Sequence, residues 1–215
     1  MLFATAYLPP VSYVAAIAEG LTLSSDTVRP SAVTIDACEH YIKQTWRNRC
    51  RIASAAGVED LRVPVVHEGG GKMIIGDVRV DYSTPWIVRT ERALEAAYRS
   101  SAFFDAYADG LFAILESRPQ RLLELNTALL RYLLSRLGIP AEISFTESYI
   151  PRGEAAGDYR DRIHPKRPDT LLEEMGLEKP YFQVFAQKYG FQSNLSCIDL
   201  LFNEGPDSIS YLVRR

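Results

Sequence analysis

Three arginines alternate with other residues in one short stretch of the chain. Arg47, Arg49 and Arg51 show the period of two that is typical of a β-strand, which we predict over residues 47–53. In a strand, the three side chains point to one face at intervals of about 6.6 Å. Guanidinium groups placed in this way repel one another unless anions lie between them, and phosphate and carboxylate are their natural partners. The pattern predicts either an anion-binding face or ion pairs with Asp and Glu across a sheet.

Residues that can move a proton come just before this stretch. His40 follows Glu39, and Lys43 lies three residues further along. A histidine beside a carboxylate can titrate near neutral pH and act as a general base, and a lysine can hold a phosphate or carboxylate group. The alternative is a polar turn whose side chains only satisfy the backbone. We take His40 and Glu39 as candidate catalytic residues and Lys43 as a candidate substrate ligand.

Asp199 and Asn203 form a second polar pair near the end of the chain. They are four residues apart in a predicted helix over residues 196–203, so they share one face. Such a pair can hydrogen-bond sugar hydroxyls or a substrate amine, and both residues enter the candidate substrate-binding set. An acidic residue in the first turn and an Asn before Gly205 also suit helix capping, which is the interpretation we favour.

The elements that must position these residues indicate one domain over residues 1–215. The first 82 residues are rich in strand patterns, helical spacing dominates residues 85–137, and a late strand is expected over residues 141–146. Two short helices close the chain. We predict an α+β or mixed α/β fold in which a strand-rich N-terminal third packs with a central helical block and C-terminal helices.

Two further expectations concern the strands. We expect residues 2–82 and 141–146 to form one mixed sheet. Residues 60–66 and 73–82 are β-branched and flank the triplet of glycines at positions 69–71, a pattern that predicts a hairpin with a mobile tip.

Residues 150–179 differ from the rest of the chain. They are rich in charge, glycine and proline, and they show little apolar periodicity. The charged residues gather around His164 and include Asp158, Arg160, Asp161 and Arg162. We predict a mobile loop, which acts either as a lid over a bound substrate or as a flexible surface segment.

Composition and missing motifs exclude several classes of function. A net charge of −3 disfavours binding to nucleic acid. The three cysteines, Cys38, Cys50 and Cys197, form no CxxC pair and match no zinc-site spacing, so we expect reduced thiols, a cytoplasmic location and no metal. No apolar run approaches the ~20 residues of a membrane span, and we expect no signal peptide. Walker, GxGxxG, HExxH and GxSxG motifs do not occur, and we expect no cofactor.

Four blocks of the sequence resemble the WbqC-like protein family. The most recognisable spans residues 39–52, E-H-Y-I-K-Q-T-W-R-N-R-C-R-I, which is similar to the family pattern H-Y-x-K-Q-x-x-R-N-R-x-x-I. The others are Y-L-P-P-V-S-Y at residues 7–13, Trp86 with Y-R-S-S-A-F-F at residues 98–104, and N-L-S-C-I-D-L-L-F-N-E-G-P at residues 194–206. The first block adds Gln44 and Asn48 to the candidate substrate-binding residues.

The resemblance implies a role in surface-polysaccharide (O-antigen) biosynthesis. For such proteins it implies transfer of an amino-acid or acyl group, glycine among them, to an amino sugar. Our leading hypothesis is a transferase whose small-molecule anionic substrate is a sugar phosphate or nucleotide-linked amino sugar, with the arginines holding the anion and His40 taking a proton from the attacking amine. The alternative is a non-catalytic module that binds an anionic metabolite or a partner protein. Donor, acceptor and oligomeric state stay open.

Overall fold

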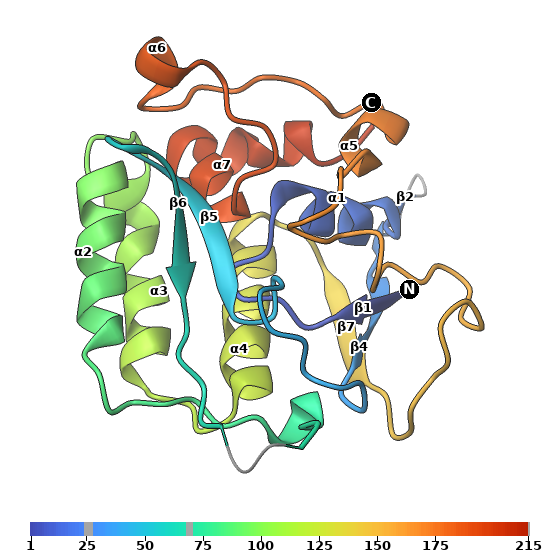
Figure 1. Ribbon diagram of the computed structural model, residues 1–215. Coiled ribbons are helices and arrows are strands. Elements are labelled where there is room, and N and C mark those ends of the chain that lie inside the picture. Colours follow the sequence, from blue (N-terminus) through green and yellow to red (C-terminus); the bar gives the residue numbers. More distant parts are fainter. Residues whose placement is uncertain (24–27, 68–70, 215) are drawn as a thin grey trace.

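The computed structural model describes residues 1–23, 28–67 and 71–214 (Figure 1). The strands are β1 (Leu2–Ala4), β2 (Thr22–Leu23), β3 (Val28–Arg29), β4 (Ser31–Asp36), β5 (Arg49–Ser54), β6 (Gly57–Arg62) and β7 (Ala141–Phe145). The helices are α1 (Val11–Glu19), α2 (Trp86–Tyr98), α3 (Phe104–Glu116), α4 (Leu122–Arg136), α5 (Leu171–Glu174), α6 (Ala186–Tyr189) and α7 (Cys197–Glu204), with short 3-10 helices η1 (Ile75–Asp77) and η2 (Gly205–Tyr211). Six of the seven strands precede the helical block, so the predicted mixed α/β class is confirmed.

A parallel sheet with the strand order β1-β4-β7 joins the start of the chain to its middle. The central strand, β4, buries Val33 and Ile35, and α1 packs against this strand. A helix between β1 and β4 is the usual connection of parallel neighbours, because their ends lie on opposite edges of the sheet. The carboxyl ends of β1, β4 and β7 all lie on one edge, so the loops that follow Ala4, Asp36 and Phe145 meet there.

An antiparallel hairpin of β5 and β6 forms a separate sheet, which corrects two expectations. Among the described residues it has no ladder to the parallel sheet, so the single mixed sheet is wrong. The hairpin expected from residues 60–66 and 73–82 is also wrong. Gly57, with a φ of 109°, turns the chain directly after β5 and pairs residues 57–62 with residues 49–54. Of the expected pairing, an isolated bridge between Val65 and Val80 is present. Positions 69 and 70, at the expected tip of the hairpin, lie outside the described residues.

The predicted central helices are confirmed as α2, α3 and α4. They lie beside the hairpin, where α2 contacts β5 and α3 packs on both α4 and α7 (Figure 1). The leucine stripe of α4 is buried, as Leu125, Leu129 and Leu133 illustrate. Gly138 adopts a φ of 69° just after this helix, which is the left-handed position that commonly ends a helix. Near the C-terminus, α6 and α7 are the two short helices expected to close the chain.

The long charged segment reaches the carboxyl edge of the parallel sheet through Arg160, and its helix α5 packs against α1. It buries apolar side chains from both of its halves, namely Ile163, Leu171, Leu172, Met175 and Leu177. The segment shows little apolar periodicity over most of its length, as expected, but α5 and the turns on either side of it still bring apolar residues into the core. Its mobility and its role as a lid stay predictions.

Candidate functional site

A buried carboxylate marks the carboxyl edge of the parallel sheet. Asp36 ends β4 and is fully buried. One of its oxygens accepts hydrogen bonds of 3.0 Å from the backbone N–H groups of Cys38 and Glu39 and from the hydroxyl of Thr146, which follows β7. The other oxygen lies 2.6 Å from Nη1 of Arg160. In open α/β sheets this edge is where ligands bind, so we place the candidate site here.

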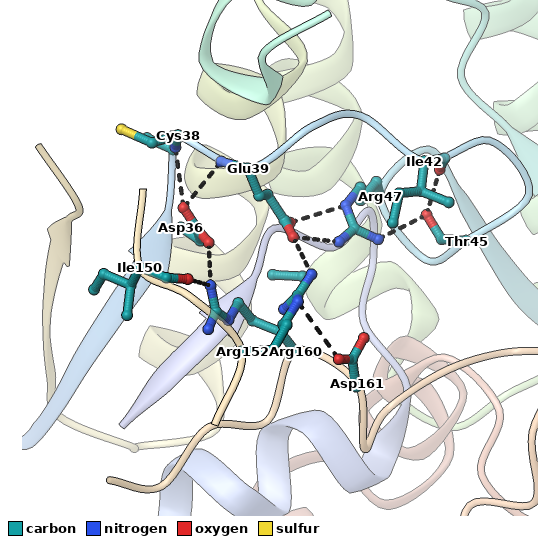
Figure 2. A network of polar contacts seen from close by, with 12 residues as sticks. Asp36, Cys38, Glu39, Ile42, Thr45, Arg47, Ile150, Arg152, Arg160 and Asp161 are labelled. Atoms are coloured by element: carbon teal, nitrogen blue, oxygen red, sulfur yellow. Dashed lines mark hydrogen bonds and ion pairs between the residues drawn. The ribbon is translucent and has the colours of Figure 1, made fainter. Parts of the chain in front are cut away.

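Arg160 ties the long segment to this edge (Figure 2). Its guanidinium is fully buried between two carboxylates, Asp36 and Asp158, and Nη2 lies 2.5 Å from Asp158 Oδ2. Nη1 also donates to the carbonyl oxygen of Ile150 at 2.7 Å. The hydrogen bond from Arg160 holds the pKa of Asp158 below its ordinary value. Because the protein itself accepts the hydrogen bonds of this buried guanidinium, Arg160 fixes the position of the segment and is not free to hold a substrate.

Glu39 holds a second arginine pair in the same network (Figure 2). Its buried carboxylate receives Arg47 in a two-pronged contact, with Nε to Oε1 at 2.9 Å and Nη2 to Oε2 at 2.6 Å. Arg152 Nη2 reaches Oε2 at 2.8 Å, and its Nε lies 3.4 Å from Asp161. Arg47 also donates to Thr45 Oγ1 at 3.1 Å. Because both oxygens of Glu39 are engaged, this carboxylate acts as a holding group for the two arginines.

The remaining arginines of the alternating stretch share one carboxylate across the hairpin. Arg49 Nη1 lies 2.9 Å from Asp60 Oδ2, and Arg51 Nε lies 3.2 Å from Oδ1. Partial burial opposes ionisation of Asp60, but the hydrogen bonds and charges of Arg49 and Arg51 lower its pKa overall. Arg51 also stands over the ring of Trp46, 5.2 Å from its centre. Of the two alternatives drawn from the sequence, these contacts match the ion pairs across a sheet.

The loop before β5 brings the other candidates of this block to the surface. His40, Lys43 and Gln44 are exposed, whereas Asn48 is half-buried and donates to the carbonyl oxygen of Val63 at 2.9 Å. Gln44 has a φ of 59°, in the left-handed region that residues other than glycine rarely adopt. Its backbone carbonyl oxygen accepts a hydrogen bond from Arg49. A ligand therefore reaches His40, Lys43 and Gln44 from solvent, and of these His40 and Lys43 have side chains that can carry a positive charge.

A basic turn of the long segment, residues 164–167, packs against this loop. Lys166 Nζ contacts Oε1 of Gln44, and Arg51 Nη2 donates to the carbonyl oxygen of Pro165 at 3.3 Å. His164 accepts a hydrogen bond at Nδ1 from the backbone N–H of Lys166 at 3.1 Å. Loop and turn form one surface although about 120 positions separate them, as the Gln44 to Lys166 contact demonstrates.

Asp199 and Asn203 lie apart from this network, and the capping interpretation is wrong for both. The Asp199 carboxylate is fully buried and accepts hydrogen bonds from Tyr181 at 2.7 Å, Tyr98 at 2.8 Å and Gln183 at 3.0 Å. Burial raises its pKa although these three donors oppose the change. Asn203 donates back to the carbonyl oxygen of Asp199 at 2.8 Å. Tertiary donors thus engage the carboxylate of Asp199, whereas the Asn203 side chain bonds a backbone carbonyl within its own helix.

Two of the three thiols are poorly suited to act as nucleophiles. Cys50 and Cys197 are buried, and burial raises the pKa of each thiol well above its ordinary value. Cys38 is half-exposed and donates to the carbonyl oxygen of Thr146 at 3.4 Å.

Sequence reasoning missed the pairing of the two arginines of the long segment with the edge of the sheet. Arg152 entered no candidate set, and Arg160 entered only as part of a mobile cluster. The density of opposite charges at residues 150–162 was the available signal, but it does not say which distant carboxylates pair with these arginines.

Fold and site together define a class of protein. It is a mixed α/β domain with a buried charge network at the carboxyl edge of a short parallel sheet. The model of the WbqC-like protein family matches residues 5–176. A protein of Mycobacterium tuberculosis (strain ATCC 25618 / H37Rv), named as uncharacterized protein Rv1507c, is 30% identical over 193 residues, which is 80% of this chain and 83% of the relative. The chain belongs to the WbqC-like protein family. No solved structure matches it.

Among the helices of residues 1–23, 28–67 and 71–214, none has both the length and the apolarity that crossing a bilayer requires.

Proposed function

We propose that this protein is a transferase of surface-polysaccharide biosynthesis that acts on a phosphorylated or nucleotide-linked amino sugar. The observation that carries the proposal is the placement of the family block, residues 39–52. It follows β4 at the carboxyl edge of the parallel sheet and presents His40 and Lys43 to solvent above a network that fixes Glu39 and Arg47. Exposed donors on a rigid base suit recognition of a small anionic sugar derivative.

In the proposed reaction, the amine of the sugar attacks the carbonyl carbon of an activated amino-acid or acyl donor. A C–N bond forms, the bond from the carbonyl carbon to the leaving group breaks, and His40 accepts the proton that the amine loses. Lys43 holds the anionic group of the substrate. Glu39, whose oxygens are engaged by Arg47 and Arg152, orients the loop and does not take the proton.

A direct test incubates the full chain with a nucleotide-linked amino sugar and activated acyl donors, and detects the amide product by mass spectrometry. His40→Ala is expected to lower kcat by roughly 10²-fold or more, the usual effect of a general base, with little change in KM. His67→Ala, at another exposed histidine, is the matched control. Unchanged turnover in His40→Ala would remove this residue from the mechanism.

The second candidate is a binding module without catalysis, and it has its own support. The buried carboxylates of the network are all paired with arginine, and two of the three thiols are buried. Binding of the sugar derivative without product, over the full set of donors, would favour this candidate.

A further inference from the structure

Within residues 1–23, 28–67 and 71–214, the positive charges on the turn of residues 164–167 form no ion pair with a carboxylate. Arg47, Arg49 and Arg51 each face a carboxylate, but Lys166 reaches the neutral amide oxygen of Gln44. Likewise, Arg167 donates from Nη1 to the backbone carbonyl oxygen of Asp161, at 3.5 Å. The carboxylate of Asp161 pairs instead with Arg152, whose Nε lies 3.4 Å from Oδ2. The charge that an anionic ligand would meet is therefore on this turn and not on the alternating arginines.

His164 adds a directed donor to the turn. Its Nδ1 accepts the backbone N–H of Lys166 at 3.1 Å, so the neutral ring carries its proton on Nε2. Burial, and then the positive charges of Arg167, Arg47 and Lys166, lower the pKa of His164, while Asp161 opposes them. The neutral ring with an Nε2–H group is thus the form present at neutral pH, and within the described part of the chain that group has no acceptor.

The backbone conformation of Gln44 is a second, independent indication that this surface is a binding site. Its left-handed conformation, at a φ of 59°, persists only where surrounding contacts hold it. Those contacts are Arg49 on its carbonyl oxygen and Lys166 on its side chain. The strained residue therefore places Lys166 beside the loop that carries His40 and Lys43.

We infer that the turn of residues 164–167 binds a phosphoryl group of the substrate, through Nε2–H of His164, the ammonium of Lys166 and the guanidinium of Arg167. Donors of this kind match the oxygens of a phosphoryl group, which accepts charge-assisted hydrogen bonds on three sides. The inference rests on the proposed function, whose substrate carries phosphate. It assigns the anion to a turn outside the family block and leaves Lys43 for the second phosphate of a diphosphate.

Calorimetric titration of the full chain with pyrophosphate tests the inference. The double variant Lys166→Ala with Arg167→Ala should bind at least roughly tenfold more weakly, because each lost charged hydrogen bond is a substantial part of the affinity. The control is Arg92→Ala with Arg99→Ala, which removes two exposed charges from α2 and its end and should bind as the parent does. Equal loss in both double variants would reduce the effect to overall charge and overturn the inference.

Two substitutions of His164 separate binding from folding of the turn. His164→Asn keeps an acceptor near the Nδ1 position but has no donor at the Nε2 position, so it should weaken pyrophosphate binding. His164→Gln offers a donor near the Nε2 position and should restore most of the affinity. The reverse order would overturn the inference. If a nucleotide-linked amino sugar binds but no variant of the turn matters, the site lies elsewhere and the proposed function survives. If no phosphate-bearing compound binds the parent chain, both fail.

Discussion

At the scale of single residues, the arginines of the network and of the alternating stretch pair with the protein's own carboxylates. Arg47 lies against Glu39, Arg49 and Arg51 share Asp60, and Arg160 is buried between Asp36 and Asp158. The alternation of residues 47–51 could be recognised in the sequence, but the partners could not. Asp60 lies opposite the stretch only because Gly57 places the turn of the hairpin, and Glu39 is reached through a loop. Pairing of this kind depends on tertiary geometry.

Arg160 should be far more important for stability than its neighbour Arg162. Arg160→Ala leaves Asp36 buried without its counter-charge, which should lower the free energy of unfolding by about 3–5 kcal/mol. Arg162→Ala removes an exposed pair with Glu174 and should cost at most about 1 kcal/mol. Urea denaturation of the two variants beside the parent measures both values. Similar costs in the two variants would show that the buried pair does not anchor the segment.

Asp199 should make stability depend on pH in a direction opposite to that of a salt-bridged carboxylate. Its folded-state pKa is raised above the ordinary 3.8, so the folded chain binds this proton more tightly than the unfolded chain. The stability that the neutral acid contributes is present below pH 3.8 and is lost as pH rises through the raised value. Asp199→Asn removes this titration. The difference in unfolding free energy, parent minus variant, should therefore fall as the pH of the urea titration is raised from 4 to 7, and a rising difference would contradict the assignment.

At the scale of elements, local patterns predicted the regular helices and failed at the connections. Val11–Glu19 and the leucine stripe of α4 follow from the spacing of apolar residues. The hairpin partner was misassigned because β6, with its sequence G-V-E-D-L-R, is mostly exposed and lacks a strong apolar alternation. The charged segment was predicted to be mobile because its buried residues have no period, although Ile163 and Arg160 hold it to the core.

Limited trypsin digestion should distinguish the anchored part of this segment from its exposed turn. Cleavage is expected first after Lys166, which is exposed, and not after Arg160, which is fully buried. Pyrophosphate should slow the first cut if it occupies the turn. Mass spectrometry of the early fragments reads out the site. Early cleavage after Arg160 would refute the anchored arrangement, and first cleavage outside residues 150–179 would refute the turn as the most accessible part of the chain.

At the scale of the whole molecule, the parallel sheet and the hairpin share one core, in which Ile35 of β4 and Ile52 of β5 belong to the same buried cluster. Tyr98 of α2 accepts a hydrogen bond from the backbone of Ala53 in β5 and donates to Asp199 of α7, and Ser196 donates its backbone N–H to Arg51. We therefore predict one cooperative unfolding transition, with coincident curves from far-UV circular dichroism and from the fluorescence of Trp46 and Trp86. Two separate transitions would indicate that the hairpin side and the sheet side unfold independently.

The central claim is that the carboxyl edge of the sheet, with its loop and basic turn, receives a phosphate-bearing amino sugar. The most direct measurement is a crystal structure of the chain with a nucleotide-linked amino sugar. We expect a phosphoryl group within hydrogen-bond distance of Lys166 Nζ and His164 Nε2, and the sugar on the side of His40. A ligand bound instead in the open hollow of about 620 Å³ beside α5, which is lined by Met175, Lys179, Tyr211 and Arg214 among others, would contradict it.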